Sequence, residues 1–195
     1  MKYTRIMISA LLLLLSAWTV QAAEWKLDAA HAEIRFDIQH IYVKTSGQFT
    51  KVDAAILFDP DHPEKSRFDF TVGVKSINTL NTKRDNHLMS KDFFNADKYP
   101  QMRFVSKQVR RVNGNEYAVE GILTIKDVSR PIVVPFYIYG PGEHPFDKKL
   151  KVVGFDASFS INRLDYKVGS GKFFKMGVVG DTVNIRMAIE ALAKK

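Results

Sequence analysis

Apolar and polar residues alternate through almost the whole chain, and this period of two constrains the fold more than any other feature. In RFDFTVGVK, residues 67–75, Phe68, Phe70 and Val72 fall on one face, and the residues between them are charged, small or polar. A strand with this pattern buries one face and exposes the other to water. The sequence therefore predicts an all-β protein.

Eight segments share the alternation, and tight-turn signals such as Asn113-Gly114-Asn115 separate some of them. Gly47 is predicted to lie in a further turn or bulge. The segments begin at Ile34, Val52, Phe68, Met102, Tyr117, Ile132, Val153 and Val183. Eight such strands form either a sandwich or a closed barrel. Their length favours an extended eight-stranded antiparallel barrel, whose interior is either filled by side chains or holds one small ligand.

The stretch NTKRDNHLMSKDFFNADKYP, residues 81–100, interrupts the alternation. Thr82 followed by Asp85 predicts a short helix over Lys83–Met89 with Thr82 as its N-cap. This insert also carries four large apolar side chains, Leu88, Met89, Phe93 and Phe94. Since these side chains need an apolar surface, the insert is predicted to cover one end of the barrel.

The first 22 residues have the features of a secretory signal peptide. Lys2 and Arg5 precede an apolar run, and Val20-Gln21-Ala22 supplies the small residues of a cleavage site. We expect cleavage after Ala22, export of the protein, and one barrel domain over residues 23–195. The chain has no cysteine, so packing alone must hold the fold together.

The chain is basic, with a net charge of +8 that falls to +6 without Lys2 and Arg5. Export argues against nucleic acid as a partner. The basic surface is then either simply solvated or makes transient contact with a membrane surface or an anionic ligand.

The inward faces of the predicted strands are almost wholly apolar, so an apolar chain is the favoured guest. The predicted tunnel consists of Ile34, Phe36, Ile38, Ile56, Phe68, Phe70, Val72, Leu88, Met89, Phe93, Phe94, Phe104, Leu123, Ile125, Phe136, Phe155, Phe159 and Ile185. The alternative is a solid core, in which case the protein is an interaction module that binds a partner on its surface.

Charged residues in or near the insert are candidates for binding the head group of such a guest. They are Arg84, His87, Lys91 and Arg163. Arg84 and Asp85 are alternatively an internal ion pair. The histidines lack metal-ligand spacing, so no metal cofactor is predicted, although His31, His40 and His87 could converge near one barrel end.

The sequence offers no constellation for catalysis. It has no cysteine nucleophile, no G-x-S-x-G motif and no H-E-x-x-H motif. Ser170 lies in a glycine-rich stretch without an identifiable base, so hydrolase activity is the weakest alternative. We predict that the protein is not an enzyme.

Several motifs resemble the YceI-like family and cover essentially the whole chain after the signal peptide. They are W-x-L-D…H-x-x-I-x-F at Trp25–Phe36, I-x-T…R-D-x-H-L-x-S-x-D-F-F at Ile77–Phe94, Y-P-x-M-x-F at Tyr99–Phe104, G-x-L-T-I at Gly121–Ile125, I-x-R-x-D-Y at Ile161–Tyr166 and V-G-D-x-V at Val179–Val183. One departure is Lys126-Asp127, where the family usually has glycine at a turn. Asp tolerates turn geometry, so the hairpin is expected to form.

The resemblance implies a lipocalin-like barrel in the bacterial periplasm that holds a long polyisoprenoid, of quinone or prenyl type, along an apolar tunnel. It also implies that the insert closes one end and that homodimers are common. On this interpretation the protein carries or stores an isoprenoid lipid and uses no other cofactor.

Overall fold

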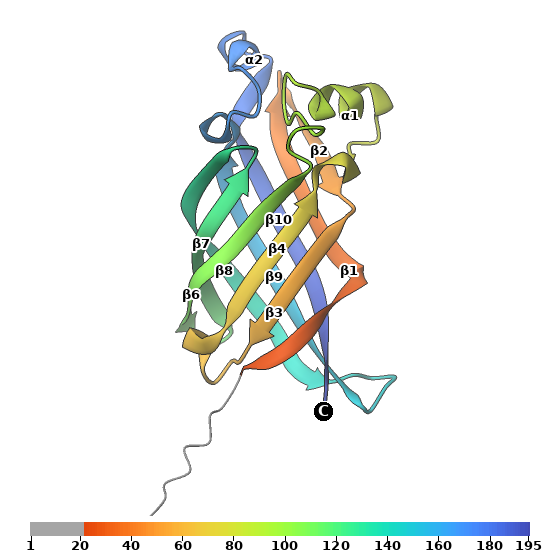
Figure 1. Cartoon of the computed structure of the whole chain (residues 1–195), viewed down its shortest axis with the longest axis vertical. Coiled ribbons are helices and arrows are strands. Elements are labelled where there is room, and N and C mark those ends of the chain that lie inside the picture. The colour runs from red at the N-terminus through yellow and green to blue at the C-terminus, as the bar shows by residue number, and fades with distance from the viewer. Residues whose placement is uncertain (1–21) are drawn as a thin grey trace, which may run out of the picture.

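The computed structural model describes residues 22–195, which form a closed eight-stranded antiparallel barrel elongated along its axis (Figure 1). The predicted signal peptide lies outside the described residues, apart from Ala22. The strands are β1 (Ala23–His40), β2 (Val43–Phe49), β3 (Val52–Phe58), β4 (Arg67–Gly73), β5 (Ile77–Asn78), β6 (Gln101–Asn113), β7 (Glu116–Ile125), β8 (Val128–Glu143), β9 (Leu150–Asn162) and β10 (Val179–Lys194).

The barrel closes where β1 pairs with β10, and the sheet order is β10-β9-β8-β7-β6-β4-β3-β1-β2-β5. Strands β2 and β3 both pair with β1, one with its second half and the other with its start, so together they occupy one position in the wall. Strand β5 extends β2 by two residues at the barrel end. The eight predicted strands are confirmed, because each predicted segment begins within a wall strand. The segment 67–75 is shorter than predicted, since β4 ends at Gly73 and Val74 and Lys75 lie in a 3-10 turn.

One glycine prediction is wrong. Gly47 lies within β2, opposite Phe36 of β1, and not in a turn or bulge. A Cβ at this position would lie 2.8 Å from Thr79 Cγ2 and closer still to the Phe36 ring. Glycine is therefore needed here for close packing.

The insert forms α1 (Thr82–Met89) and the turns that follow it. The N-cap is Asn81 and not Thr82, because Asn81 is extended and its Oδ1 accepts the Arg84 backbone N–H at 3.0 Å. The Asp85 carboxylate instead accepts hydrogen bonds from the backbone N–H and the hydroxyl of Thr79, at 2.9 Å and 2.6 Å. It thereby fastens the start of the insert to the segment that follows β5.

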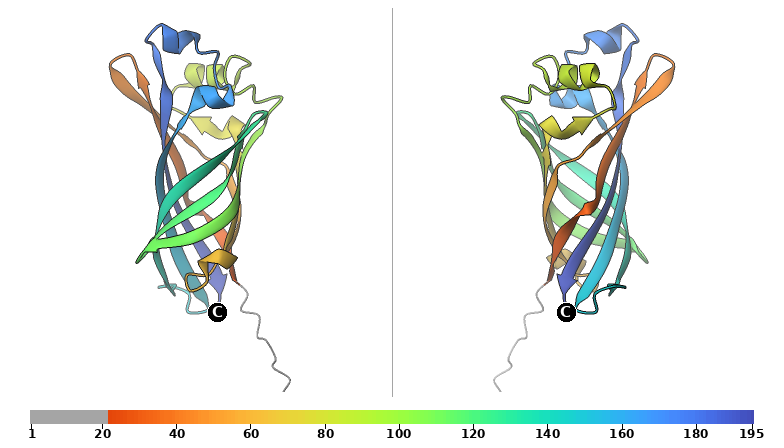
Figure 2. Two further views of the ribbon diagram at one scale, coloured as in Figure 1. Left: turned by 90° about the vertical axis from the view of Figure 1, so that its left-hand side faces the viewer. Right: turned by 90° about the vertical axis from the view of Figure 1, so that its right-hand side faces the viewer.

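A second helical segment comes before β10. It contains the 3-10 turn η3 (Arg163–Tyr166) and α2 (Lys172–Lys175). Two further 3-10 turns are η1 (Pro63–Lys65) and η2 (Val74–Ser76). The end of the barrel with α1 and α2 is called the upper end below, and the end with the C-terminus is the lower end (Figure 2). No helix among residues 22–195 is long and apolar enough to cross a membrane.

The lower part of the barrel is filled by side chains. The rings of Phe58, Phe68, Tyr117, Phe136 and Phe155 pack with centroids 5.2–6.5 Å apart. Trp25 closes this cluster, and its indole N–H donates to the Phe58 carbonyl at 3.0 Å. The barrel therefore has a solid floor, and any hollow lies above it.

Candidate functional site

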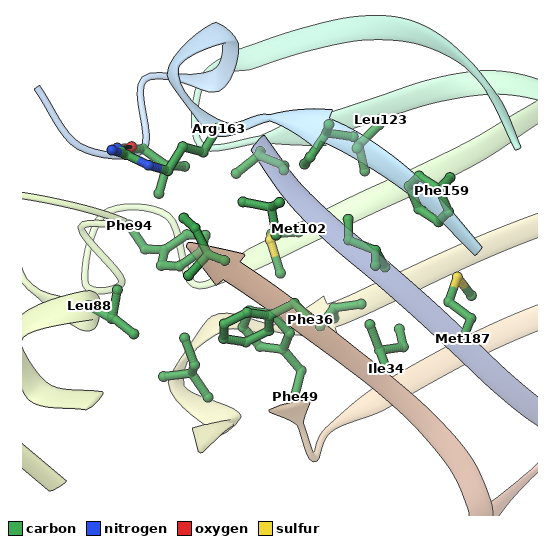
Figure 3. A pocket seen from close by; sticks show the side chains of 18 of the residues that line it. Ile34, Phe36, Phe49, Leu88, Phe94, Met102, Leu123, Phe159, Arg163 and Met187 are labelled. Carbon is green, nitrogen blue, oxygen red and sulfur yellow. Dashed lines mark hydrogen bonds between the residues drawn. The ribbon is translucent and has the colours of Figure 1, made fainter. Parts of the chain in front are cut away.

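A cavity of about 680 Å³ occupies the upper part of the barrel. This volume is within the range of small-ligand sites. Apolar side chains from the strands form its wall, and Leu88, Phe94 and Arg163 lie at its upper end (Figure 3). The lining extends to the exposed residues His40, Asn81 and Lys83, so the cavity reaches the surface at this end.

Most residues that the sequence placed in a tunnel line this cavity. They are Ile34, Phe36, Ile38, Phe68, Phe70, Val72, Leu88, Phe93, Phe94, Phe104, Leu123, Ile125, Phe136, Phe155, Phe159 and Ile185. Three of the four head-group candidates, Arg84, His87 and Arg163, also belong to the lining. The apolar residues of the strands and those of the insert therefore line the same cavity.

Three predicted residues lie elsewhere. Ile56 is only 1% exposed and belongs to the lower cluster, because it faces inward below the cavity. Met89 packs against a second cluster of buried residues, which includes Phe49 and Phe93, and it does not line the cavity. Lys91 is exposed in the turn after α1.

The sequence did not predict that a second segment, α2, covers the upper end of the barrel together with the insert. Phe173 of α2 lines the cavity and stacks on Phe93, with ring centroids 6.1 Å apart and planes 8° apart. The His87 ring meets the edge of Phe93 at 5.0 Å. The signal was present in the sequence, since the Phe173-Phe174 pair in a polar, glycine-rich stretch repeats the pattern of Phe93-Phe94.

Other missed lining residues come from the wall strands. Phe49 of β2 packs between Phe36, at 5.6 Å, and Phe94, at 6.1 Å, so it connects the wall to the insert. Met102 of β6 and Met187 of β10 also face the cavity (Figure 3). Methionine adapts its shape readily, so these two side chains can adjust within the wall.

Arg163 is a buried cation at the upper end of the cavity, with 5% of the residue exposed. Its Nε donates to the Gly180 carbonyl and its Nη1 to the Val168 carbonyl, both at 2.7 Å. Burial lowers the pKa of Arg163 from its usual value. These bonds join the loop that follows η3 to the start of β10.

Arg84 is also engaged within the protein. Its Nε donates to Thr79 Oγ1 and its Nη2 to the Thr79 carbonyl, both at 2.7 Å. No ion pair joins Arg84 to Asp85 among the described residues, because both side chains bind Thr79. Lys83, by contrast, lines the cavity mouth and has no salt bridge within residues 22–195.

The histidines do not converge. His40 and His87 line the cavity, whereas His31 lies on the outer surface beside a bulge in β1. His31 Nδ1 is 2.8 Å from Asp28 Oδ2 and 3.9 Å from Glu190 Oε2, in an exposed group. This group is far from being a closed coordination site, since its three members are partly or fully exposed.

Ser170 lies on the loop before α2. Its hydroxyl accepts the Lys172 backbone N–H at 3.4 Å, and no described histidine or carboxylate forms a hydrogen bond with it. A serine nucleophile requires an adjacent base. The geometry in the described part of the chain therefore favours binding over acyl transfer.

The chain matches the family model of the YceI-like domain over residues 25–191. It is 32% identical to a UPF0312 protein of Photorhabdus laumondii over the full length of both chains. It is also 32% identical to Protein YceI of Escherichia coli O6:H1, over 94% of each chain.

Solved structures show the same fold. Burkholderia cenocepacia BcnA matches with a TM-score of 0.77 and 28% identity, over 85% of this chain and 99% of that one. The Campylobacter jejuni YCEI protein matches with a TM-score of 0.71 and 32% identity, over 80% of this chain and 90% of that one. A polyisoprenoid binding domain from Saccharophagus degradans, at 15% identity and a TM-score of 0.66 over 89% and 99% of the chains, shares the fold. With a family model that spans nearly all of the barrel and relatives matched end to end, the chain belongs to the YceI-like domain family.

Proposed function

We propose that this protein is a periplasmic carrier or store for a long-chain isoprenoid lipid of the quinone or polyprenyl type. The apolar cavity of about 680 Å³ is the observation that carries this proposal. The lipid chain would enter the cavity from the upper end, run down it and stop at the aromatic side chains that fill the lower part of the barrel. The signal peptide expected over residues 1–22 would deliver the protein to the periplasm.

Solvation provides the driving force for such binding. The wall of Ile, Val, Phe and Met side chains offers water few hydrogen-bond partners, so water gains little by filling the cavity. A hydrocarbon chain gains about 0.8 kcal/mol for each CH₂ group that leaves water. A polar ligand would instead lose hydrogen bonds without replacement.

The shape of the wall supports a branched chain over a straight one. Rings and branched side chains, among them Phe36, Phe70 and Phe159, line the cavity of about 680 Å³ and give it an uneven wall. Methyl branches at regular intervals would fill such a space better. The polyisoprenoid binding domain from Saccharophagus degradans shares only 15% sequence identity with this protein. The proposed ligand class therefore depends on the cavity and not on that likeness.

The head group would lie at the mouth. The side chains of Arg84 and Arg163 donate to backbone and threonine oxygens, and Arg103 pairs with Asp69. Lys83 is the lining lysine whose ammonium group has neither a hydrogen bond nor a salt bridge within residues 22–195. Asn81 and Thr79 add polar groups beside it. This arrangement suits a quinone carbonyl or a phosphate that keeps contact with water.

A cavity-filling variant tests the proposal. Protein purified under native conditions is extracted with organic solvent, and the extract is analysed by mass spectrometry for a long-chain isoprenoid in stoichiometric amount. Ala157→Phe places a ring into the cavity and should reduce the extracted lipid at least about tenfold. Ser158→Phe on the same strand points outward and is the matched control, which should retain the lipid.

The outcome also discriminates between functions. A lipid-free wild-type protein that fails to take up an added polyprenyl alcohol would contradict the carrier proposal and favour the interaction module. Straight-chain fatty acids in the extract would retain the carrier but refute the isoprenoid class. If the wild-type protein hydrolyses an ester in a substrate screen and Ser170→Ala does not, that result would support the hydrolase alternative.

A further inference from the structure

Large apolar side chains protrude from the upper end of the barrel. We call them the apolar rim, which consists of Ile41, Tyr42, Val43, Leu80, Phe174 and Met176. Tyr42 and Leu80 are each 94% exposed, and Val43 and Met176 are 64% and 61% exposed. Single exposed apolar residues are ordinary on a protein surface, but a group at one opening marks an interaction site.

The rim residues come from three separate segments at the cavity mouth: the β1–β2 turn with the first residue of β2, the residue before Asn81, and α2 with its C-cap. The turn between β1 and β2 carries Ile41, whose backbone N–H donates to the Val178 carbonyl at 2.9 Å. Val178 follows α2 and lines the cavity. Leu80 precedes Asn81, another lining residue, at the start of α1. Figure 2 shows that the β1–β2 turn, α1 and α2 all lie at the same end of the barrel.

Two rim residues occupy positions where local backbone chemistry favours other residue types. Ile41 has a φ of 51° and Leu80 a φ of 59°, in the left-handed region. Glycine and asparagine adopt this conformation readily, whereas a β-branched residue such as isoleucine does so at a cost. Burial of the side chain does not offset this conformational cost, since Ile41 is 48% exposed and Leu80 is 94% exposed. An external partner would supply that burial.

Lysines lie among the apolar rim residues. Lys44, Lys172 and Lys175 are exposed beside them, and Lys83 stands at the mouth. None of the four forms a salt bridge with a residue in the range 22–195. Carboxylates at this end have partners within the protein: Asp85 accepts from Thr79 and Asp92 lies 3.4 Å from His87. Asp97 pairs with Lys75, Asp127 pairs with Lys167, and Asp181 accepts from Asn162. The upper end therefore presents unpaired positive charge around apolar tips.

We propose that the rim docks onto an anionic lipid bilayer, so that the cavity mouth faces the membrane and the lipid ligand passes between the two without crossing water. This inference rests on the proposed function and specifies where the ligand is exchanged. Apolar side chains on loop tips insert between lipid head groups, and lysines near the surface are attracted by anionic lipids.

The composition of the rim favours a membrane over a protein partner. Lysine is depleted in protein interfaces, and the apolar core of such an interface is a continuous, closely packed patch. The rim instead consists of three small apolar groups around an opening, and exposed lysines adjoin two of them in the sequence. A second copy of the chain would leave most of these lysines facing one another.

Vesicle sedimentation tests the docking surface. One vesicle type contains phosphatidylethanolamine and phosphatidylglycerol, and the other contains phosphatidylcholine alone. Wild-type protein should bind the anionic vesicles more tightly, and added salt should weaken this binding. Tyr42→Ser with Leu80→Ser should weaken binding to anionic vesicles at least about tenfold. Phe146→Ser at the lower end, where Phe146 is also 94% exposed, is the matched control and should bind as the wild type does.

The charge contribution is tested separately. Lys172→Glu with Lys175→Glu should weaken binding to anionic vesicles and leave the weak binding to phosphatidylcholine unchanged. Lys148→Glu with Lys149→Glu makes the same change in the loop between β8 and β9, at the lower end, and should have a much smaller effect.

The docking proposal and the carrier proposal fail in different ways. Rim variants that bind vesicles as tightly as the wild type, or no more weakly than Phe146→Ser, would overturn the docking proposal even if extraction yields an isoprenoid. Loss of a dimer in the rim variants would assign the rim to a second copy and also overturn it. Vesicle binding through the rim by a protein that never contains lipid would instead overturn the carrier function alone.

Discussion

Close packing between glycines and phenylalanines shapes the cavity wall at the scale of single residues. Gly47 lies against the Phe36 ring, and Gly121 lies against the Phe104 ring. In each pair the two residues are on neighbouring strands, and both rings line the cavity. The absent Cβ leaves room for each ring to lie over the strand, which keeps the centre of the cavity free.

Gly121→Ala should disturb this arrangement. The added Cβ would lie 2.6 Å from the Val105 carbonyl oxygen and would also press on the Phe104 ring. We expect the free energy of unfolding to fall by about 1–3 kcal/mol, as overpacking does elsewhere. Chemical denaturation measures this change. Gly142→Ala is the control, because a Cβ there meets nothing within 4 Å, and an equal loss in both variants would contradict the packing argument.

A second prediction at this scale concerns the ionisation of His31. Its hydrogen bond with Asp28 raises the pKa of His31 above 6.5. The interaction stabilises the folded state below the unfolded pKa of about 6.5, and the stabilisation is lost as the pH rises through the folded pKa. Proton NMR titration should show the raised pKa in the wild type. Asp28→Asn should return it toward the ordinary value, and an unchanged pKa in that variant would refute the assignment.

At the scale of elements, Lys126 connects the two helical segments that cover the upper end of the barrel. Lys126, in the turn between β7 and β8, has a φ of 57°, so the left-handed position falls on Lys126 and not on Asp127. Its Nζ donates to the Phe93 carbonyl at 2.9 Å and to the Lys167 carbonyl at 2.6 Å. The expected hairpin is confirmed, and the lysine also ties it to the insert and to the segment before α2.

Lys126→Met should loosen both covers while it preserves the aliphatic part of the side chain. Two charge-assisted hydrogen bonds are lost, so we expect the free energy of unfolding to fall by about 1–3 kcal/mol. Hydrogen exchange measured by mass spectrometry should speed up around Phe93 and around Lys167. Lys107→Met, at an exposed position on β6, should leave exchange in both segments unchanged. Uniform acceleration across the barrel would show a general loss of stability instead.

On the scale of the whole molecule, the barrel has both kinds of interior between which the sequence did not decide, one filled by side chains and one hollow. Its lower part is a solid core, and its upper part is a cavity of about 680 Å³. Phe155 belongs to both, because it packs on Phe58 with ring centroids 5.2 Å apart and also lines the cavity. On the proposed function, this floor would limit the length of lipid chain that the barrel holds. The homodimer implied by the family resemblance stays a prediction.

Replacing Phe155 should lengthen the cavity and change the length of the bound chain. Phe155→Ala is expected to lower the free energy of unfolding by about 3–5 kcal/mol, and Phe155→Leu to lower it less. Mass spectrometry of extracts should show a shift toward longer isoprenoids in whichever variant folds. Phe146→Ala, on the exposed lower loop, should leave the length distribution unchanged. A folded Phe155 variant with the wild-type distribution would show that the floor does not select length.

The sequence by itself determined the strands, the inward face of each and the position of the insert, because alternation and helix-start signals depend on neighbouring residues. It did not distinguish the positions of Ile56 and Phe36, because both show the same inward-facing pattern. Ile56 lies in the solid lower part of the barrel, whereas Phe36 lies on the cavity wall. Alternation indicates the face of a strand but not the height at which a residue lies within the closed barrel.

Only the tertiary structure decided that height, since it depends on the stagger of all eight strands around the axis. The same holds for the second cover. Phe173 reaches Phe93 across 80 positions of sequence because β10 closes the barrel beside β1 and brings the preceding helix over the mouth. The cavity exists because these long-range pairings hold its walls apart while the floor fills below.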